Sequence, residues 1–146
     1  MSEPSLEELW QRKADHEHGA PTPEEEALDI FWYLVDLGEK SEDVRRFIPE
    51  LKQGLSAYAG AVIKHNQLRD VVEGRSATAE ELQAIEGADD NRTRVHDALI
   101  STLNAIMRAC VKGKLDTKWK DVVGLHPLDR TVVGRWALAV ARAIAG

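Results

Sequence analysis

The clearest pattern of hydrophobic and polar positions lies in residues 92–112, RTRVHDALISTLNAIMRACVK. At the ~100° per residue of an α-helix, the apolar side chains share one face and the polar side chains the other, which predicts a helix with one side in a core. The apolar face comprises Val95, Leu99, Ile100, Leu103, Ile106, Met107, Cys110 and Val111. Arg92 and His96 break this pattern, because they fall in line with the apolar face at its N-terminal end.

A second long amphipathic helix is predicted from about Ile48 to Gly74. Its apolar face comprises Ile48, Leu51, Leu55, Tyr58, Ala59 and Val62, and the same face continues as His65, Asn66, Arg69 and Glu73. The face therefore changes from apolar to polar within one helix. Pro49 either kinks a helix that begins at Ser41 or begins a new helix near Ile48, and both alternatives stay open.

Shorter patterns predict further helices. Thr22 and Pro23, followed by three glutamates, mark the start of an almost wholly apolar helix that ends at Gly38. We also expect a first helix at about residues 5–18, a short helix before Gly87, about one turn after Asp116, and a last helix at about residues 128–145.

No stretch of the chain alternates with period two over the length of a strand, so the predicted fold class is all-α. We expect an antiparallel helical bundle of about five or six helices with a central long-helix hairpin. A chain of 146 residues can bury a core without disulfides or metal ions, and residues 1–146 are interpreted as one domain, with residues 1–20 as a loosely docked N-terminal helix.

The two long helices are expected to pair as that hairpin. With a connection of about a dozen residues, the numbers of facing residues sum to roughly 162. Leu51 then faces Cys110, Leu55 faces Met107, and Tyr58 faces Leu103. Beyond these apolar layers the polar ends of the two faces meet: His65 and Asn66 with His96, Arg69 with Arg92, and Glu73 with Asp89.

This polar end is the main candidate site. Two histidines, two arginines and two acids at one place could bind an anion, hold a metal ion or supply acid–base chemistry. The alternative is structural: Arg69 with Asp89 and Arg92 with Glu73 form ion pairs across the hairpin, each stabilising it by only ~0–1 kcal/mol.

Composition narrows the function classes. The formal net charge is −6, and the basic residues are interleaved with acids, which disfavours binding to nucleic acid or to an anionic membrane. The single cysteine, Cys110, excludes a disulfide framework and a zinc site with several cysteines. The acidic N-terminal sequence MSEPSLEELW has no apolar run, and no segment reaches the ~20 apolar residues of a membrane span, so we expect a cytoplasmic protein.

Two resemblances to known families extend these predictions. Residues 92–104 read Arg92-x-x-x-His96-Asp97-Ala98-Leu99-Ile100-x-x-Leu103-Asn104 and look like small bacterial helical proteins classed as domains of unknown function. This resemblance implies a helical bundle without a known activity, and it singles out Arg92, His96 and Asn104. Residues 24–39, EEEALDIFWYLVDLGE, resemble a helix of the all-α dimeric dUTPases and MazG-type enzymes.

Three functions follow as hypotheses. The first is a non-enzymatic helical bundle without a cofactor, acting through contact with a protein partner or as a homodimer. The second is a nucleotide phosphohydrolase that holds Mg²⁺ on Glu25 and Asp29, four residues apart on one helix, with Glu86-Gly87-Ala88-Asp89 as a second acidic motif. The third is a small-molecule or anion pocket at the polar end of the hairpin.

Overall fold

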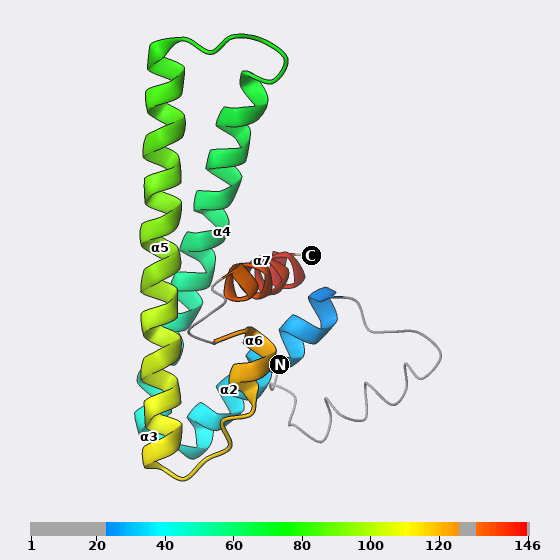
Figure 1. Ribbon diagram of the computed structural model, residues 1–146. Coiled ribbons are helices and arrows are strands. Elements are labelled where there is room, and N and C mark those ends of the chain that lie inside the picture. Colours follow the sequence, from blue (N-terminus) through cyan, green and yellow to red (C-terminus); the bar gives the residue numbers. More distant parts are fainter. Residues whose placement is uncertain (1–22, 126–130, 146) are drawn as a thin grey trace, which may run out of the picture.

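The computed structural model describes residues 23–125 and 131–145, and all the regular structure in this part of the chain is helical. The helices are α2 (Pro23–Lys40), α3 (Glu42–Arg45), α4 (Ile48–Val71), α5 (Ala79–Lys112), α6 (Trp119–Val123) and α7 (Thr131–Ala145) (Figure 1). The predicted all-α bundle with a central hairpin is confirmed. The helix predicted at residues 5–18 lies outside the described residues.

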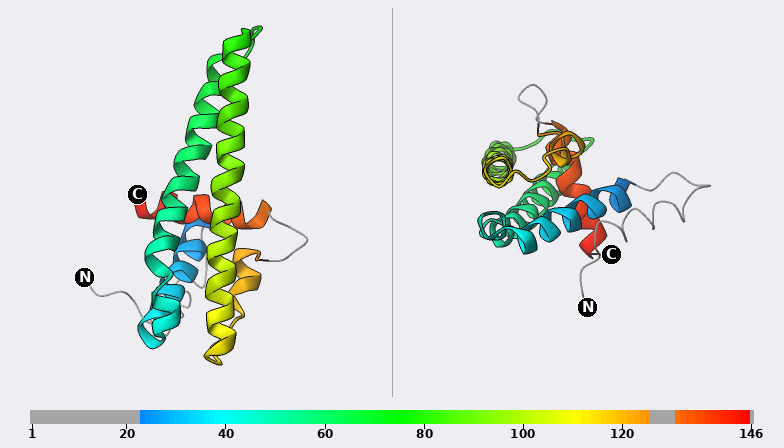
Figure 2. Two further views of the ribbon diagram at one scale, coloured as in Figure 1. Left: turned by 90° about the vertical axis from the view of Figure 1, so that its left-hand side faces the viewer. Right: turned by 90° about the horizontal axis from the view of Figure 1, so that it is seen from below.

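Helices α4 and α5 form the axis of the molecule. They lie antiparallel and side by side along most of their length, and their mutual contact is the most extensive in the described part (Figures 1 and 2). The other helices pack around one half of this hairpin. The other half, which leads to the turn between α4 and α5, projects beyond them with no third helix beside it among those described (Figure 2).

The core lies where α2 and α7 meet the hairpin. Its fully buried side chains include Phe31, Leu34, Leu51, Leu99, Leu103, Ile106, Trp119, Val133 and Val140. Burying each large apolar side chain contributes ~1.5–3 kcal/mol before entropy costs. The indole Nε1 of Trp136 also donates a buried hydrogen bond of 3.2 Å to the carbonyl oxygen of Ala27, which ties α7 to α2.

The structure corrects the predicted end of α2 and decides between the two alternatives for Pro49. Helix α2 does not end at Gly38 but continues to Lys40. A Cβ at Gly38 would lie 3.1 Å from Cγ1 of Ile48, so this glycine permits the close approach of the following segment. Pro49 lies in the first turn of α4, where its missing N–H has no intrahelical partner to lose, and a new helix therefore begins at Ile48.

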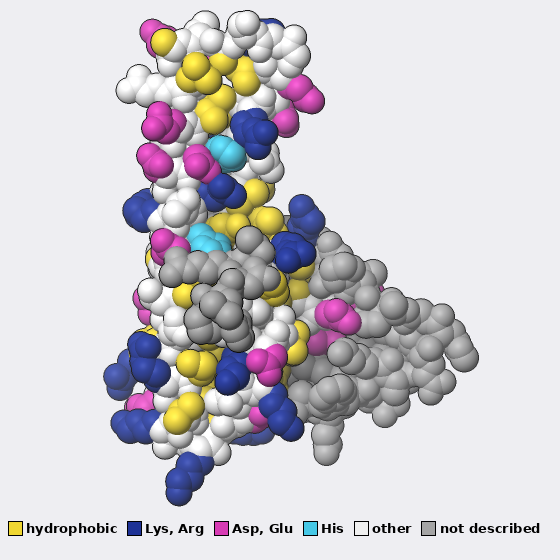
Figure 3. Space-filling view, viewed as in Figure 1, with side chains coloured by type: hydrophobic (Ala, Val, Ile, Leu, Met, Phe, Trp, Pro, Cys, Tyr) yellow, Lys and Arg dark blue, Asp and Glu magenta, His cyan; other side chains and the backbone are white. Residues whose placement is uncertain are grey.

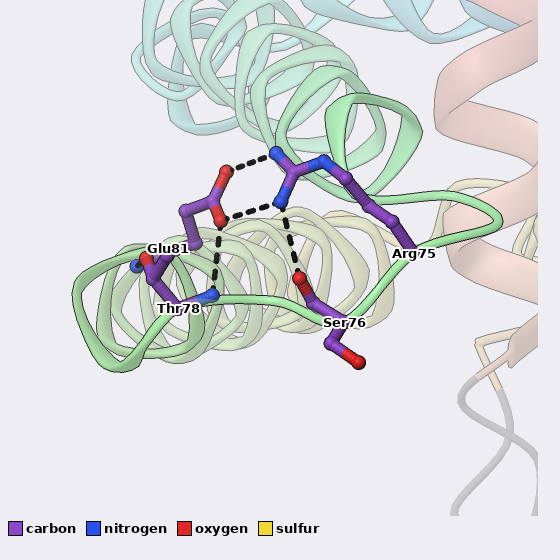
Figure 4. Close-up of polar contacts among 4 residues, drawn as sticks. All are labelled: Arg75, Ser76, Thr78 and Glu81. Atoms are coloured by element: carbon purple, nitrogen blue, oxygen red, sulfur yellow. Dashed lines mark hydrogen bonds and ion pairs between the residues drawn. The ribbon is translucent and has the colours of Figure 1, made fainter.

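The prediction of a separate short helix before Gly87 is wrong, because α5 runs without a break for 34 residues from Ala79. Its start is held by a capping box: Thr78 Oγ1 accepts the Glu81 N–H, and Glu81 Oε1 accepts the Thr78 N–H (Figure 4). Arg75 donates to the same carboxylate and lowers the pKa of Glu81 to about 2. One interior glycine costs a helix only ~1 kcal/mol relative to alanine, which does not end it at Gly87.

The early start of α5 shortens the connection to residues 72–78, in which Gly74 takes a φ of +77°. The register of the hairpin therefore differs from the prediction. Tyr58 faces His96, His65 faces Asp89, and a Cβ at Gly54 would lie 3.3 Å from Leu99 Cδ1, so facing numbers sum to roughly 154 rather than 162.

The pairings predicted from the longer connection, such as Tyr58 with Leu103 and His65 with His96, are wrong. The shift of eight residues is about two helical turns, which brings the same faces together with different partners. Val111, which was predicted on the apolar face, is 64% exposed.

A substitution at Gly134 tests how closely α7 crosses the hairpin. A Cβ there would lie 2.6 Å from Tyr58 Oη, so Gly134→Ala should lower the free energy of unfolding by ~1–3 kcal/mol through overpacking. Gly87→Ala is the matched control, because nothing lies within 4 Å of its Cβ position, and it should raise stability by up to ~1 kcal/mol. Chemical denaturation of both variants measures these changes; equal effects would contradict the described crossing.

Candidate functional site in the central hairpin

Four residues of the predicted polar end, His65, Asp89, Arg92 and His96, lie in the middle of the hairpin rather than at its end. We call Tyr58, His65, Asp89, Arg92 and His96 the polar section. Towards the core, the helices meet through apolar side chains such as Leu51, Leu99 and Leu103. Towards the turn, apolar side chains such as Leu68, Val72 and Ile85 line the grooves beside the helices, because α5 begins at Ala79, well before the predicted residues 92–112.

Asp89 is the centre of the polar section. Arg92 Nε donates to Asp89 Oδ1 over 3.2 Å, and His65 Nε2 lies 3.9 Å from the same oxygen, which is an ion pair only when the imidazole is protonated. The hydrogen bond from Arg92 is the main reason that the pKa of Asp89 is lowered, and the charges of Arg92, His65 and Arg69 act in the same direction. Asp89 is therefore ionised at neutral pH.

His96 lies in a separate layer of the polar section. Its ring is 5.5 Å from the ring of Tyr58, and its Nδ1 is 3.5 Å from Asp97 Oδ1. Helix α7 closes this layer, since a Cβ at Gly134 would lie 3.7 Å from His96 Cδ2. Tyr58 and His65 are seven residues apart on α4, so the two histidine layers are separated by ~10 Å along the hairpin. Figure 3 shows the two described histidines as separate cyan patches on one face of the molecule.

Three other predicted residues lie beside a groove of about 420 Å³ near the turn. Its lining consists of Asn66, Arg69, Asp70, Val72, Glu73 and Ile85. One arginine and two carboxylates give this lining no excess of positive charge, so the groove offers no support for the anion-pocket hypothesis. The sequence does not predict Asp70 as part of this lining, because Asp70 lies outside the face that helical periodicity assigns to the hairpin contact.

Asn104, singled out by the resemblance, lies outside the polar section. It is half-buried on α5, twelve residues beyond Arg92, which is ~18 Å along a helix. Tyr58 was assigned to an apolar layer by its periodicity, and its position against His96 depends on the register, which periodicity does not determine.

The residues proposed to hold Mg²⁺ do not form a cluster. Glu25 is exposed and Asp29 is buried on α2. Glu86 and Asp89 do have helical spacing within α5, but Asp89 is hydrogen-bonded to Arg92. No group of three or more histidine, cysteine, aspartate or glutamate side chains that could hold a metal ion is found within residues 23–125 and 131–145. In the same ranges, no helix has the length and apolar character to cross a membrane.

Comparison with known proteins shows which family the chain belongs to. A family model described as "Protein of unknown function (DUF3232)" matches residues 16–140, which include the whole hairpin. The chain belongs to this family. The predicted resemblance to an uncharacterised helical domain is thereby confirmed, and the family description assigns no activity to it. Searches of curated proteins and of solved structures found no significant match.

The lowered pKa of Asp89 predicts that the stability of this DUF3232 protein depends on pH. Because the folded-state pKa of Asp89 is lowered, its ionised form stabilises the fold, and this contribution is lost as the pH falls below about 4. Arg92→Gln should raise the pKa of Asp89 and weaken the acid dependence of unfolding. Carboxyl NMR titration of Asp89 measures the first effect and urea unfolding between pH 3 and 6 the second.

Arg94→Gln is the matched control for Arg92→Gln. Arg94 is exposed on the same helix and donates to Asn91 rather than to Asp89. If both variants shift the Asp89 titration equally, the specific role of Arg92 is contradicted.

Proposed function

We propose that the protein acts by self-association through the projecting half of its hairpin, without an enzymatic reaction. We call this half the hairpin arm: residues 60–71 of α4, the connection 72–78, and residues 79–96 of α5. The observation that carries the proposal is that, from the His96 layer closed by α7 to the turn, no third described helix lies beside the arm (Figure 2). Two paired helices bury one stripe of each other and leave their remaining faces in water.

Apolar side chains on the arm support the proposal. Six large apolar side chains are exposed within the described residues, and three of them, Ile63, Val71 and Leu82, lie on the arm with exposures of 55%, 64% and 57%. Hydrophobic side chains also gather over the upper part of the hairpin in Figure 3. A single exposed apolar residue is ordinary, but several on one segment without a covering element favour a protein contact.

A groove on the arm fits a helix. It has a volume of about 500 Å³ and is lined by Gly60, Ala61, Lys64, Leu68, Ala84, Ala88 and Asn91. Small side chains let another helix approach closely, and Lys64 is the one charged residue of this lining. Residues 60, 64, 68 and 71 lie on one side of α4 by helical spacing, so the exposed Val71 continues the groove towards the turn.

The charges of the arm favour a second copy as the occupant. Residues 70–86, at the tip, contain five acidic residues and one basic residue. Residues 60–69 and 87–96, in the middle, contain four basic and two acidic residues. The arm therefore carries two complementary patches of opposite sign, and two arms together would form a four-helix bundle.

Val71→Lys tests the proposal by placing a charge in the contact. We expect the wild-type mass in solution to rise with concentration from monomer to dimer, and Val71→Lys to remain monomeric. Light scattering during size exclusion, or sedimentation equilibrium, measures both. Val111→Lys is the matched control: Val111 is also a 64% exposed valine in the last turn of a long helix, but it lies outside the arm, and it should dimerise normally.

A monomeric wild-type protein at all concentrations, or equal loss of dimer in both variants, would overturn the proposal. Circular dichroism of each variant separates loss of association from loss of fold.

A further inference from the structure

Two charged residues of the arm have no counter-ion in the described part of the chain: Lys64, which lines the groove, and Glu80, which lies one turn before Ala84 of the lining on the same side of α5. Lys64 and Glu80 are both exposed, and neither forms an ion pair there. Other charged residues of the arm do have partners within it: Glu81 pairs with Arg75, Asp89 with Arg92, and the guanidinium of Arg94 donates to Asn91. Lys64 lies in the basic middle of the arm, and Glu80 in its acidic tip.

The register of the hairpin relates these two positions. Facing residue numbers sum to roughly 154, so Glu80 lies level with residue 74 at the turn. Lys64 and Glu80 are therefore about ten residues apart along the arm, or ~15 Å. Midway between them lie Leu68 and Ala84, which are uncharged and line the groove.

We infer that two copies of the chain associate with their arms antiparallel, so that Lys64 of each copy pairs with Glu80 of the other; this inference rests on the proposed function. A two-fold axis that passes midway between the two levels brings each lysine opposite a glutamate. The apolar residues Leu68 and Val71 then lie next to the axis, with one ion pair on either side. In a parallel arrangement, each lysine would instead face a lysine and each glutamate a glutamate.

The inferred arrangement explains why the charges of the arm are divided between tip and middle. Complementary charges at the rim of an interface fix its orientation and add little to its affinity. The central contact supplies the apolar burial, while the two ion pairs exclude the parallel alternative, which costs like-charge repulsion at both levels.

Charge reversal tests the arrangement. Lys64→Glu alone and Glu80→Lys alone should each weaken the homodimer by about tenfold, because two ion pairs become two like-charge contacts. An equimolar mixture of the two variants should form a heterodimer as tight as the wild-type dimer, since each contact again joins opposite charges. The double variant Lys64→Glu/Glu80→Lys should also recover. Sedimentation equilibrium at low salt measures the dissociation constants of the wild type, the two single variants, their mixture and the double variant.

The outcomes separate this inference from the proposed function. A wild-type dimer that neither reversal weakens, or a mixture no tighter than its components, overturns the antiparallel pairing and leaves self-association intact. A parallel dimer gives a different result: a mixture of Lys64→Glu with wild type is then tighter than either protein alone. A monomeric wild type overturns both. Both residues are exposed, and circular dichroism confirms that the variants fold.

Discussion

The register of α4 against α5 is the constraint on which the rest of the structure depends. It sets Tyr58 against His96, where α7 crosses at Gly134, and His65 against Asp89 one layer further along. Polar residues at core positions of paired helices cost stability but disfavour other registers. A slip of one turn would take Asp89 away from His65 and the ring of Tyr58 away from the ring of His96, so both contacts across the hairpin would be lost.

Local patterns in the sequence predict much of this fold, because helical periodicity reports which face of each helix is buried. The faces of α2, α4 and α5 follow from it, and the capping signals at Ser41 and Thr78 lie where helices begin. The register does not follow, because it depends on the length of the connection. Gly87 suggested a break, whereas the capping box at Thr78 starts α5 earlier. An error of two turns leaves the faces unchanged, so periodicity alone does not detect it.

The sequence predicts which residues belong to the candidate site better than it predicts how they are arranged. His65, Asp89 and Arg92 do meet, because all three lie on the faces that the helices turn towards each other. The two histidines belong to different layers, and Asn104 lies further along α5, because these relations depend on the register and on the position of α7. Membership of the DUF3232 family identifies the chain without assigning it a reaction. The uncovered hairpin arm is therefore the feature from which a function is proposed.

Proton–proton Overhauser contacts between aromatic rings measure the register most directly. In an NMR spectrum of the protein, the account predicts contacts between the ring protons of Tyr58 and His96, whose ring centroids are 5.5 Å apart, and none between His65 and His96. A contact between the two histidine rings, together with contacts from Tyr58 to Leu103, would contradict it, since it would place the hairpin in the register two turns away.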